Sequence, residues 1–279
     1  MPLTRVPAPE PSAAVPLPLS ARAGLSPRPA TAGIALDLGG AALPEAVRDL
    51  ARERWALDVT TAPGAVDPWG LPAVGALLGQ ARAEQVIRAF SARTNLSLAG
   101  ARVAVVGDGP IAAALSTALT RIGSRVLVVS GSPLPRLRAR LAGLADAPPD
   151  ELGPAHLDHV FHSGEADEPI SVPGAGRLLV DASPAGAAIP DAASAHAADS
   201  GDGDAATADA ARSGVHAVVG GGWRVDPPPL ISTAASGNGL SGLDRHVADV
   251  IVAFALLTTQ GETIDPDRAD AQLAELVIA

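Results

Sequence analysis

The segment that most constrains the fold is residues 98–132, LAGARVAVVGDGPIAAALSTALTRIGSRVLVVSGS. Residues 101–106 and 125–129 are short apolar runs without alternation, which is typical of parallel strands buried on both faces. Between them, residues 110–122 have the small and apolar side chains of a helix, and Gly123 predicts its end. A strand–helix–strand unit of this kind predicts a parallel sheet covered by helices.

The turn between the first strand and the helix reads G-x-G-x-x-A. Gly107 permits a tight turn, Gly109 lets a pyrophosphate approach the backbone, and Ala112 lets helix and strand pack closely. Its position between a strand and a helix favours dinucleotide-binding architecture over a glycine-rich unit that binds nothing. The predicted cofactor contacts here are Gly107, Asp108, Gly109, Pro110, Ile111 and Ala112. The carboxylate of Asp108 would lie near the diphosphate, so a vestigial nucleotide site stays an open alternative.

The composition narrows the range of partners. The formal net charge is −10, which argues against a general binder of nucleic acid or of acidic membranes. No apolar run reaches the roughly 20 residues of a membrane helix, and the N-terminus lacks an apolar signal core with a charged flank. The sequence contains no cysteine, lysine or tyrosine. We expect a cytoplasmic protein with a small-molecule dinucleotide as partner, and with neither nucleic acid nor membrane.

Strands that alternate with helices along the chain predict an α/β fold. We expect a Rossmann-like doubly wound parallel sheet with a short N-terminal α/β extension and a C-terminal helical segment. The parts predicted in chain order are a flexible Pro/Ala-rich tail (1–32), a small α/β segment with a long connecting helix (33–95), a Rossmann dinucleotide-binding domain (96–240) and C-terminal helices that pack back on the N-terminal segment (241–279). The apolar helix predicted over residues 244–259 and the Ala-rich helices could form the seam of a homodimer.

Apolar runs outside the glycine unit predict further elements. The additional strands are expected at residues 33–38, 55–61, 159–162, 177–181, 215–219 and 230–233, and the additional helices include 44–54 and 73–94. Within the sheet, we expect residues 103–106 to be central, with 126–129 beside them and 178–181 on the other side, so that the strand order reverses at Gly107. The Ala- and Asp-rich residues 190–212 are expected to form a solvated insertion.

Several motifs in and before the glycine unit resemble one known family. Gly79-Gln80, Thr94-Asn95 and Leu98-Ala99-Gly100 precede the glycine turn in the order found in the cofactor domain of adenosylhomocysteinase (S-adenosyl-L-homocysteine hydrolase). The resemblance is good over residues 79–133. It implies a Rossmann domain that binds NAD, the cofactor with which that family temporarily oxidises a ribose carbon of its nucleoside substrate.

The chain also departs from this family. The family has a glutamate at the end of the second strand, which binds the adenine ribose, and the matching residue here is Ser130. The family's active site uses a lysine, and its tail supplies a lysine and a tyrosine to a neighbouring subunit's cofactor, whereas this chain has neither residue type. Only about 60 residues predicted to be structured precede Gln80, so the family's substrate domain is curtailed. We therefore do not expect hydrolysis of adenosylhomocysteine.

A second set of candidate cofactor contacts is Ser130, Ser132 and Arg136. Hydroxyls and an arginine in place of an acidic residue are the pattern that admits a 2′-phosphate. On this interpretation, dinucleotide affinity is weak and at least as good for NADP as for NAD. The alternative is that Arg136 lies on an exposed helical face with its neighbouring arginines. Ser183, in the small-residue turn after the strand 177–181, is a further candidate because ligands bind at the carboxyl ends of such strands.

The histidines show no helical H-E-x-x-H spacing, so we expect no metal site. The sequence predicts an NAD(P)-binding Rossmann protein, either an NAD(P)-linked oxidoreductase or a cofactor sensor, and identifies no catalytic residue. Two alternatives stay open. One is a non-catalytic scaffold for protein–protein contact, and the other is a binder of a nucleoside or an adenosylmethionine-type ligand.

Overall fold

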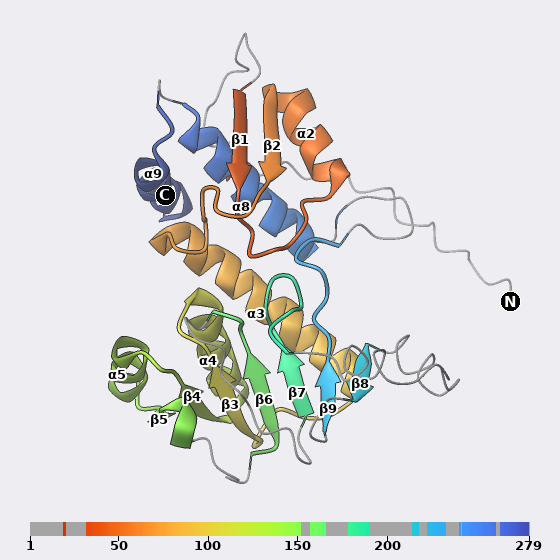
Figure 1. Cartoon of the computed structure of the whole chain (residues 1–279), viewed down its shortest axis with the longest axis vertical. Helices are drawn as coiled ribbons and strands as arrows, with labels where there is room; N and C mark the ends of the chain where they lie inside the picture. The colour runs from red at the N-terminus through yellow and green to blue at the C-terminus, as the bar shows by residue number, and fades with distance from the viewer. Residues whose placement is uncertain are drawn as a thin grey trace, which may run out of the picture.

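The chain forms two lobes that are joined by one long helix, α3 (Pro72–Thr94) (Figure 1). The computed structural model describes residues 19–20, 32–151, 157–165, 178–189, 214–217, 222–232, 240, 242–260 and 263–278. The lower lobe in Figure 1 contains a large sheet, and the upper lobe contains a small one. None of the helices in these ranges has the length and apolarity needed to cross a membrane.

The lower lobe is built on a seven-stranded sheet with the order β5-β4-β3-β6-β7-β9-β8. Its strands are β3 (Arg102–Val106), β4 (Arg125–Val129), β5 (Ala145–Ala147), β6 (His159–His162), β7 (Leu178–Asp181), β8 (Val215–Ala217) and β9 (Trp223–Val225). All neighbouring strands pair in parallel except β8, which pairs antiparallel with β9. The chain runs outward from β3 through β4 to β5 and then returns to β6, so the strand order reverses between β3 and β6. This order confirms the predicted Rossmann-like doubly wound sheet.

The valine-rich strands lie in the middle of the sheet because they are buried on both faces. Residues Val103–Val106 of β3 are completely buried. The helices that follow β3 and β4 are α4 (Pro110–Ile122) and α5 (Pro133–Leu141), and a short 3₁₀ turn, η1, spans Pro149–Glu151. The helix and both strands of the glycine unit therefore lie where the sequence predicts them.

The structure corrects three details of the predicted sheet. β6, and not the segment 178–181, pairs directly with β3, and β7 lies one strand further out. β5 was not predicted because its sequence, ADA, is too short and too polar to show a pattern. The strand expected at 230–233 is absent over its described residues 230–232, and β9 takes the place next to β7. The segment 190–212 lies outside the described residues.

In the described ranges, the upper lobe combines a two-stranded parallel sheet with helices that cover it. These elements are β1 (Ala32–Leu36), α2 (Glu45–Trp55), β2 (Leu57–Thr61), α8 (Gly242–Thr258) and α9 (Pro266–Ile278). α8 is the core of this lobe, since Val247, Val250 and Phe254 have no exposed surface. The suggestion that this helix forms a dimer seam is therefore wrong, because its apolar surface is already buried within the same chain.

Part of the predicted tail is also buried. Leu19 and Ser20 donate backbone N–H bonds of 3.0 Å to the two carboxylate oxygens of Asp249 in α8. Both residues are less than 8% exposed, which corrects the expectation of a mobile or surface-draped segment at these two positions. The remainder of residues 1–31 lies outside the described residues.

α3 is held at its first turn and near its middle by residues far away in the sequence. Asp270 of α9 accepts N–H bonds of 2.8–3.1 Å from Ala73 and Val74 in its first turn. Further along, the completely buried Arg82 donates to the carbonyls of Ala182 (3.1 Å) and Pro228 (2.7 Å) in the lower lobe. Burial lowers the pKa of Arg82 to about 10, which leaves the side chain charged at neutral pH.

Gly79 lets α3 approach α4 closely. A Cβ at Gly79 would lie 2.7 Å from the carbonyl oxygen of Pro110, the first residue of α4. A Cβ at Gly75 would lie 2.4 Å from the carbonyl oxygen of Trp69, in the loop before α3, and 3.4 Å from Cγ of Pro110. The first turn of α4 is therefore packed against the backbone of α3 at Gly79. This contact fixes the start of α4, and with it the glycine turn.

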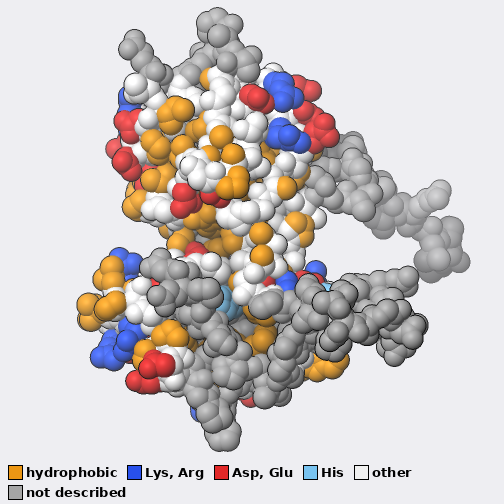
Figure 2. Space-filling model, in the orientation of Figure 1, with side chains coloured by type: hydrophobic (Ala, Val, Ile, Leu, Met, Phe, Trp, Pro, Cys, Tyr) orange, Lys and Arg blue, Asp and Glu red, His pale blue; other side chains and the backbone are white. Residues whose placement is uncertain are grey.

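The two sheets face one another with their carboxyl ends. β1 and β2 point toward the lower lobe, whereas β6 and β7 point toward the upper lobe (Figure 1). The loops that follow them touch, since a Cβ at Gly39 would lie 3.2 Å from the ring of Pro184. The surface narrows between the two lobes on the face shown in Figure 2. The glycine turn belongs to the lower of these facing edges, which is where open α/β sheets bind ligands.

The close approach of α3 to α4 can be tested with Gly79→Ala. Alanine favours a helix over glycine by about 1 kcal/mol, but here its Cβ would meet the Pro110 backbone. We expect a net loss of about 1–3 kcal/mol in the free energy of unfolding, measured by urea denaturation. Gly242→Ala is the matched control, because a Cβ at Gly242 meets no atom within 4 Å. A Gly79→Ala protein as stable as the wild type would contradict the packing described here.

Candidate functional site

The glycine turn connects β3 to α4 at the point where the strand order reverses. Gly107 has a φ of 142°, and a Cβ there would lie 1.9 Å from the hydroxyl of Ser163. A Cβ at Gly109 would lie 2.6 Å from the carboxyl carbon of Glu165. Both fingerprint glycines therefore lie against the segment that follows β6, Gly107 against the short side chain of Ser163 and Gly109 against the movable end of Glu165.

Glu165 binds the first turn of α4 with its carboxylate. Oε1 accepts the N–H of Ile111 and Oε2 accepts the N–H of Ala112, both at 2.9 Å. We refer to these two backbone groups as the α4 amide pair. They are donors at a helix N-terminus, where both the free N–H groups and the helix dipole favour an anion. The pair thus already holds an anion, and this anion is supplied by the protein itself.

Burial dominates the electrostatics of Glu165. It raises the pKa of the Glu165 carboxyl above its usual value, while the N–H bonds from Ile111 and Ala112 act in the opposite direction. The backbone N–H of Glu165 donates to the hydroxyl of Ser163 at 3.3 Å, which ties the residue to the end of β6. Within the described part of the chain, no arginine or histidine forms an ion pair with Glu165.

Asp108 and Ser132 meet beside the glycine turn, but Ser130 does not point into the same space. The hydroxyl of Ser132 donates to Oδ2 of Asp108 at 2.8 Å, and Oδ1 of Asp108 is buried without a hydrogen-bond partner. Ser130 is completely buried, and its hydroxyl bonds to the N–H and the carbonyl of Ser132, both at 3.0 Å. A carboxylate rather than the Ser130 hydroxyl therefore lies at the carboxyl ends of β3 and β4.

Arg136 forms an ion pair with a carboxylate of β5. Its Nε lies 3.1 Å from Oδ2 of Asp146, and Arg140 binds the other oxygen of the same residue at 2.6 Å. The hydrogen bond from Arg140 is the main cause that lowers the pKa of Asp146. Leu134, Leu137 and Arg140 are exposed, as expected for a solvated helix. The structure therefore pairs Arg136 with Asp146 on the α5 side of the sheet.

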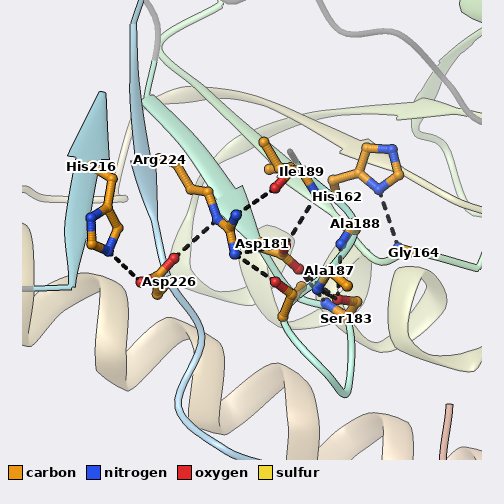
Figure 3. Close-up of polar contacts among 12 residues, drawn as sticks. His162, Gly164, Asp181, Ser183, Ala187, Ala188, Ile189, His216, Arg224 and Asp226 are labelled. Carbon is orange, nitrogen blue, oxygen red and sulfur yellow. Dashed lines mark hydrogen bonds and ion pairs between the residues drawn. The ribbon is translucent and has the colours of Figure 1, made fainter. Parts of the chain in front are cut away.

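Ser183 belongs to a separate polar network that closes the turn after β7 (Figure 3). Its hydroxyl donates to Asp181 Oδ1 at 2.7 Å and accepts the N–H of Ala187 at 2.9 Å. Asp181 is completely buried, and its Oδ2 lies 3.4 Å from a guanidinium nitrogen of Arg224. In the same figure, His216 contacts Asp226 at 2.6 Å. These contacts give Asp181 and Ser183 a role in shaping the turn.

A cavity of about 1080 Å³ starts at the glycine turn and continues along α3 and α4. Its polar lining includes Gln80, Asp108, Thr117, Arg121 and Arg138. The turn is therefore open on its Asp108 side, whereas Glu165 covers the α4 amide pair. In the described ranges, no three histidine or acidic side chains come together in a way that could hold a metal ion.

Sequence reasoning did not identify Glu165. Only the strand order could have identified this residue. Glu165 follows the strand 159–162 by three residues, and the carboxyl end of β6 lies next to the glycine turn because β6 pairs with β3. The predicted order, with 178–181 beside β3, would have placed a different loop there. Asp146 was missed together with β5, the strand that carries it.

Comparisons with known proteins give only distant similarity. No protein-family model and no curated protein matches the chain. Among solved structures, the chain is similar to the dipicolinate synthase A chain from Bacillus subtilis (14% identity, TM-score 0.42, 88% of this chain and 66% of that chain covered). It is also similar to a transhydrogenase from Sinorhizobium meliloti (13%, 0.39, 83% and 63%) and to L-tryptophan dehydrogenase from Nostoc punctiforme (14%, 0.37, 84% and 63%). The chain spans less than two thirds of the length of each of these proteins, and this similarity is too low to support an inference about activity.

The assignment of Glu165 as a buried carboxyl can be tested by measuring stability as a function of pH. Because burial raises its pKa, the folded chain holds this proton to higher pH than the unfolded chain. Its contribution to stability is therefore complete below the unfolded pKa and is lost as the pH rises through the folded pKa. We expect wild type to lose stability relative to Glu165→Gln as the pH rises above roughly 4.3, the pKa of a glutamate in an unfolded chain, measured by urea denaturation. The exposed Glu275 provides the control Glu275→Gln, which removes the same charge from the surface of α9. A Glu165→Gln difference that does not change with pH would contradict the assignment.

Proposed function

We propose that the chain binds a nicotinamide dinucleotide with its diphosphate at the α4 amide pair. The observation that carries this proposal is the reversal of strand order between β3 and β6, directly at the turn that contains Gly107 and Gly109. Ligands of open α/β sheets bind outside the carboxyl ends of the strands at such a reversal. The two sheets also face one another with their carboxyl ends, which supports a ligand position between the lobes (Figure 1).

The backbone at the turn fits a diphosphate. Gly109 carries no side chain that would keep a phosphate from the backbone, and α4 begins with Pro110, which has no N–H to offer. The α4 amide pair binds the carboxylate of Glu165 at 2.9 Å, so its two donors are already oriented for an anion at this place. Once Glu165 moves away, the same donors are available to phosphate oxygens.

For the adenine ribose, we assign Asp108 in place of Ser130. Asp108 has a buried carboxylate oxygen without a partner at the edge of the cavity, and a carboxylate is the acceptor that suits free ribose hydroxyls. The same charge would repel a 2′-phosphate, and Arg136 is already paired with Asp146. We therefore infer a preference for NAD over NADP, which reverses the preference that Ser130 and Arg136 suggest in the sequence.

A bound nicotinamide dinucleotide would supply hydride transfer. The chain contains no lysine or tyrosine to act as an acid or base. The proposed role is therefore that of a dinucleotide-binding protein of the oxidoreductase or cofactor-sensor type. The resemblance to adenosylhomocysteinase supports the cofactor domain alone, and we do not propose hydrolase activity.

The contact between Glu165 and the α4 amide pair favours one other function for the chain. A ligand without a diphosphate, such as a nucleoside or an adenosylmethionine-type molecule, could bind through Asp108 while Glu165 stays on the α4 amide pair. Calorimetry with NAD, NADP, adenosine and adenosylhomocysteine distinguishes the two functions. Binding of the nucleosides without binding of either dinucleotide would replace the proposed function by this one.

The glycine turn is tested with Gly109→Val. Its branched side chain would fill the space next to the α4 amide pair, so we expect NAD binding to be lost while circular dichroism shows an intact fold. Gly33→Val is the matched control, because a Cβ at Gly33 is 4.0 Å from its nearest neighbour and lies in the other lobe. NAD binding that survives Gly109→Val would show that the diphosphate does not use this turn.

The ribose assignment is tested with Asp108→Asn. We expect the difference in binding free energy between NAD and NADP to shrink by roughly 1–3 kcal/mol, the scale of a hydrogen bond to a charged group. Calorimetric titration of both cofactors measures this difference. Asp67→Asn, in a loop of the upper lobe, provides the same loss of charge and should leave the difference unchanged. If Asp108→Asn leaves the preference between NAD and NADP unchanged, Asp108 does not bind the ribose, and the end of β4 becomes the candidate position again.

A further inference from the structure

Glu165 occupies the donors that the proposed function assigns to a diphosphate. We propose that Glu165 is an internal anion that closes the dinucleotide site in the free chain, and that the cofactor binds by displacing its carboxylate from the α4 amide pair. This inference rests on the proposed dinucleotide binding and adds the way in which that binding is controlled.

The Glu165 carboxylate and a cofactor diphosphate cannot bind the α4 amide pair at the same time. Both carboxylate oxygens of Glu165 are used, one on the N–H of Ile111 and one on the N–H of Ala112. The carboxylate also lies against Gly109, since a Cβ there would be 2.6 Å from Oε1 and 3.0 Å from Oε2. The glycine that would let a phosphate approach the backbone thus has its open side filled by the carboxylate. A diphosphate at this turn would meet both the same donors and the same space.

The contact is of a kind that a stronger anion can replace. Within the described part of the chain, no cationic side chain forms an ion pair with Glu165, and its charge is stabilised by N–H donors and by the hydroxyl of Ser163. Burial opposes that charge, as the raised pKa of the carboxyl shows. A diphosphate carries more negative charge and more acceptor oxygens than one carboxylate, and its binding would return Glu165 to water.

The backbone next to Glu165 can stay in place during this exchange. Ser163 is completely buried, and its hydroxyl lies at the position that a Cβ of Gly107 would occupy. Gly164 has a φ of 77° and lies against the side chain of Ser183, with only 2.6 Å between its ideal Cβ position and the Ser183 Cβ. These contacts fix the start of the segment, so that rotation of the Glu165 side chain is sufficient to open the α4 amide pair.

The proposal is tested by calorimetric titration of the full chain with NAD. Removal of the carboxylate in Glu165→Ala should raise the affinity for NAD by about tenfold, the factor expected if the site is open in about a tenth of free wild-type molecules. Glu165→Gln, which keeps the shape and one acceptor oxygen without the charge, should give a smaller gain. Glu275→Ala removes the same charge from an exposed position in α9 and should bind as the wild type does.

The outcomes separate this inference from the proposed function. Equal or weaker binding of NAD by Glu165→Ala, with binding by the wild type, would overturn the internal-anion role and leave dinucleotide binding in place. Binding of NAD by neither protein would overturn dinucleotide binding, and the internal-anion role with it.

A second measurement does not require a variant to fold. In ¹⁵N-labelled wild type, the amide signals of Ile111 and Ala112 should shift on titration with inorganic diphosphate, and the amide of Glu165 should shift with them because its side chain leaves. Shifts at Ile111 and Ala112 without a change at Glu165 would overturn the displacement. An absence of shifts at all three amides would show that the α4 amide pair takes no external anion and would also overturn it.

Discussion

The position of the candidate site depends on how closely α3 approaches the first turn of α4. Gly79 leaves this crossing without a side chain, since a Cβ there would lie 2.7 Å from the carbonyl oxygen of Pro110. α3 also joins the two lobes, and its buried Arg82 binds carbonyl groups of the loops that follow β7 and β9. One helix therefore sets both the start of α4 and the distance between the facing sheet edges. In this chain, the glycine of the Gly79-Gln80 pair has a packing reason that is independent of any cofactor.

Carboxylates hold free backbone N–H groups at several important points of the fold. Asp270 binds the first turn of α3, Glu165 binds the first turn of α4, and Asp249 binds Leu19 and Ser20. Each of these carboxylates comes from a distant segment, so each contact is both a cap and a tertiary link. The contact of Glu165 differs from the others because it lies at the reversal of strand order, where a ligand would compete for the same donors. The contact between a carboxylate and backbone N–H groups is thus structural in the upper lobe, whereas in the lower lobe it is a candidate for the control of ligand binding.

The fingerprint glycines show why a motif does not by itself establish occupancy. Gly107 is required because of its φ of 142° and because Ser163 lies against it, whereas Gly109 lies against the movable carboxylate of Glu165. A dinucleotide would impose the same requirement for small residues at these positions. The motif therefore indicates that something approaches the backbone closely, and the surrounding structure decides whether this is a cofactor, a side chain, or each in turn.

The sequence by itself determined the central unit of the lower lobe and the long helix before it. Valine-rich runs specify buried strands, and glycine, proline and apolar spacing specify the turn and α4, because these signals are local. The sequence could not place β5 or β9, which are three residues each, or show that β6 separates β3 from β7. Only the tertiary structure brought Glu165 to the α4 amide pair, Asp108 to Ser132 and Asp146 to Arg136. These pairings join segments up to 54 residues apart, and their geometry depends on strand order, which hydrophobic patterning does not encode.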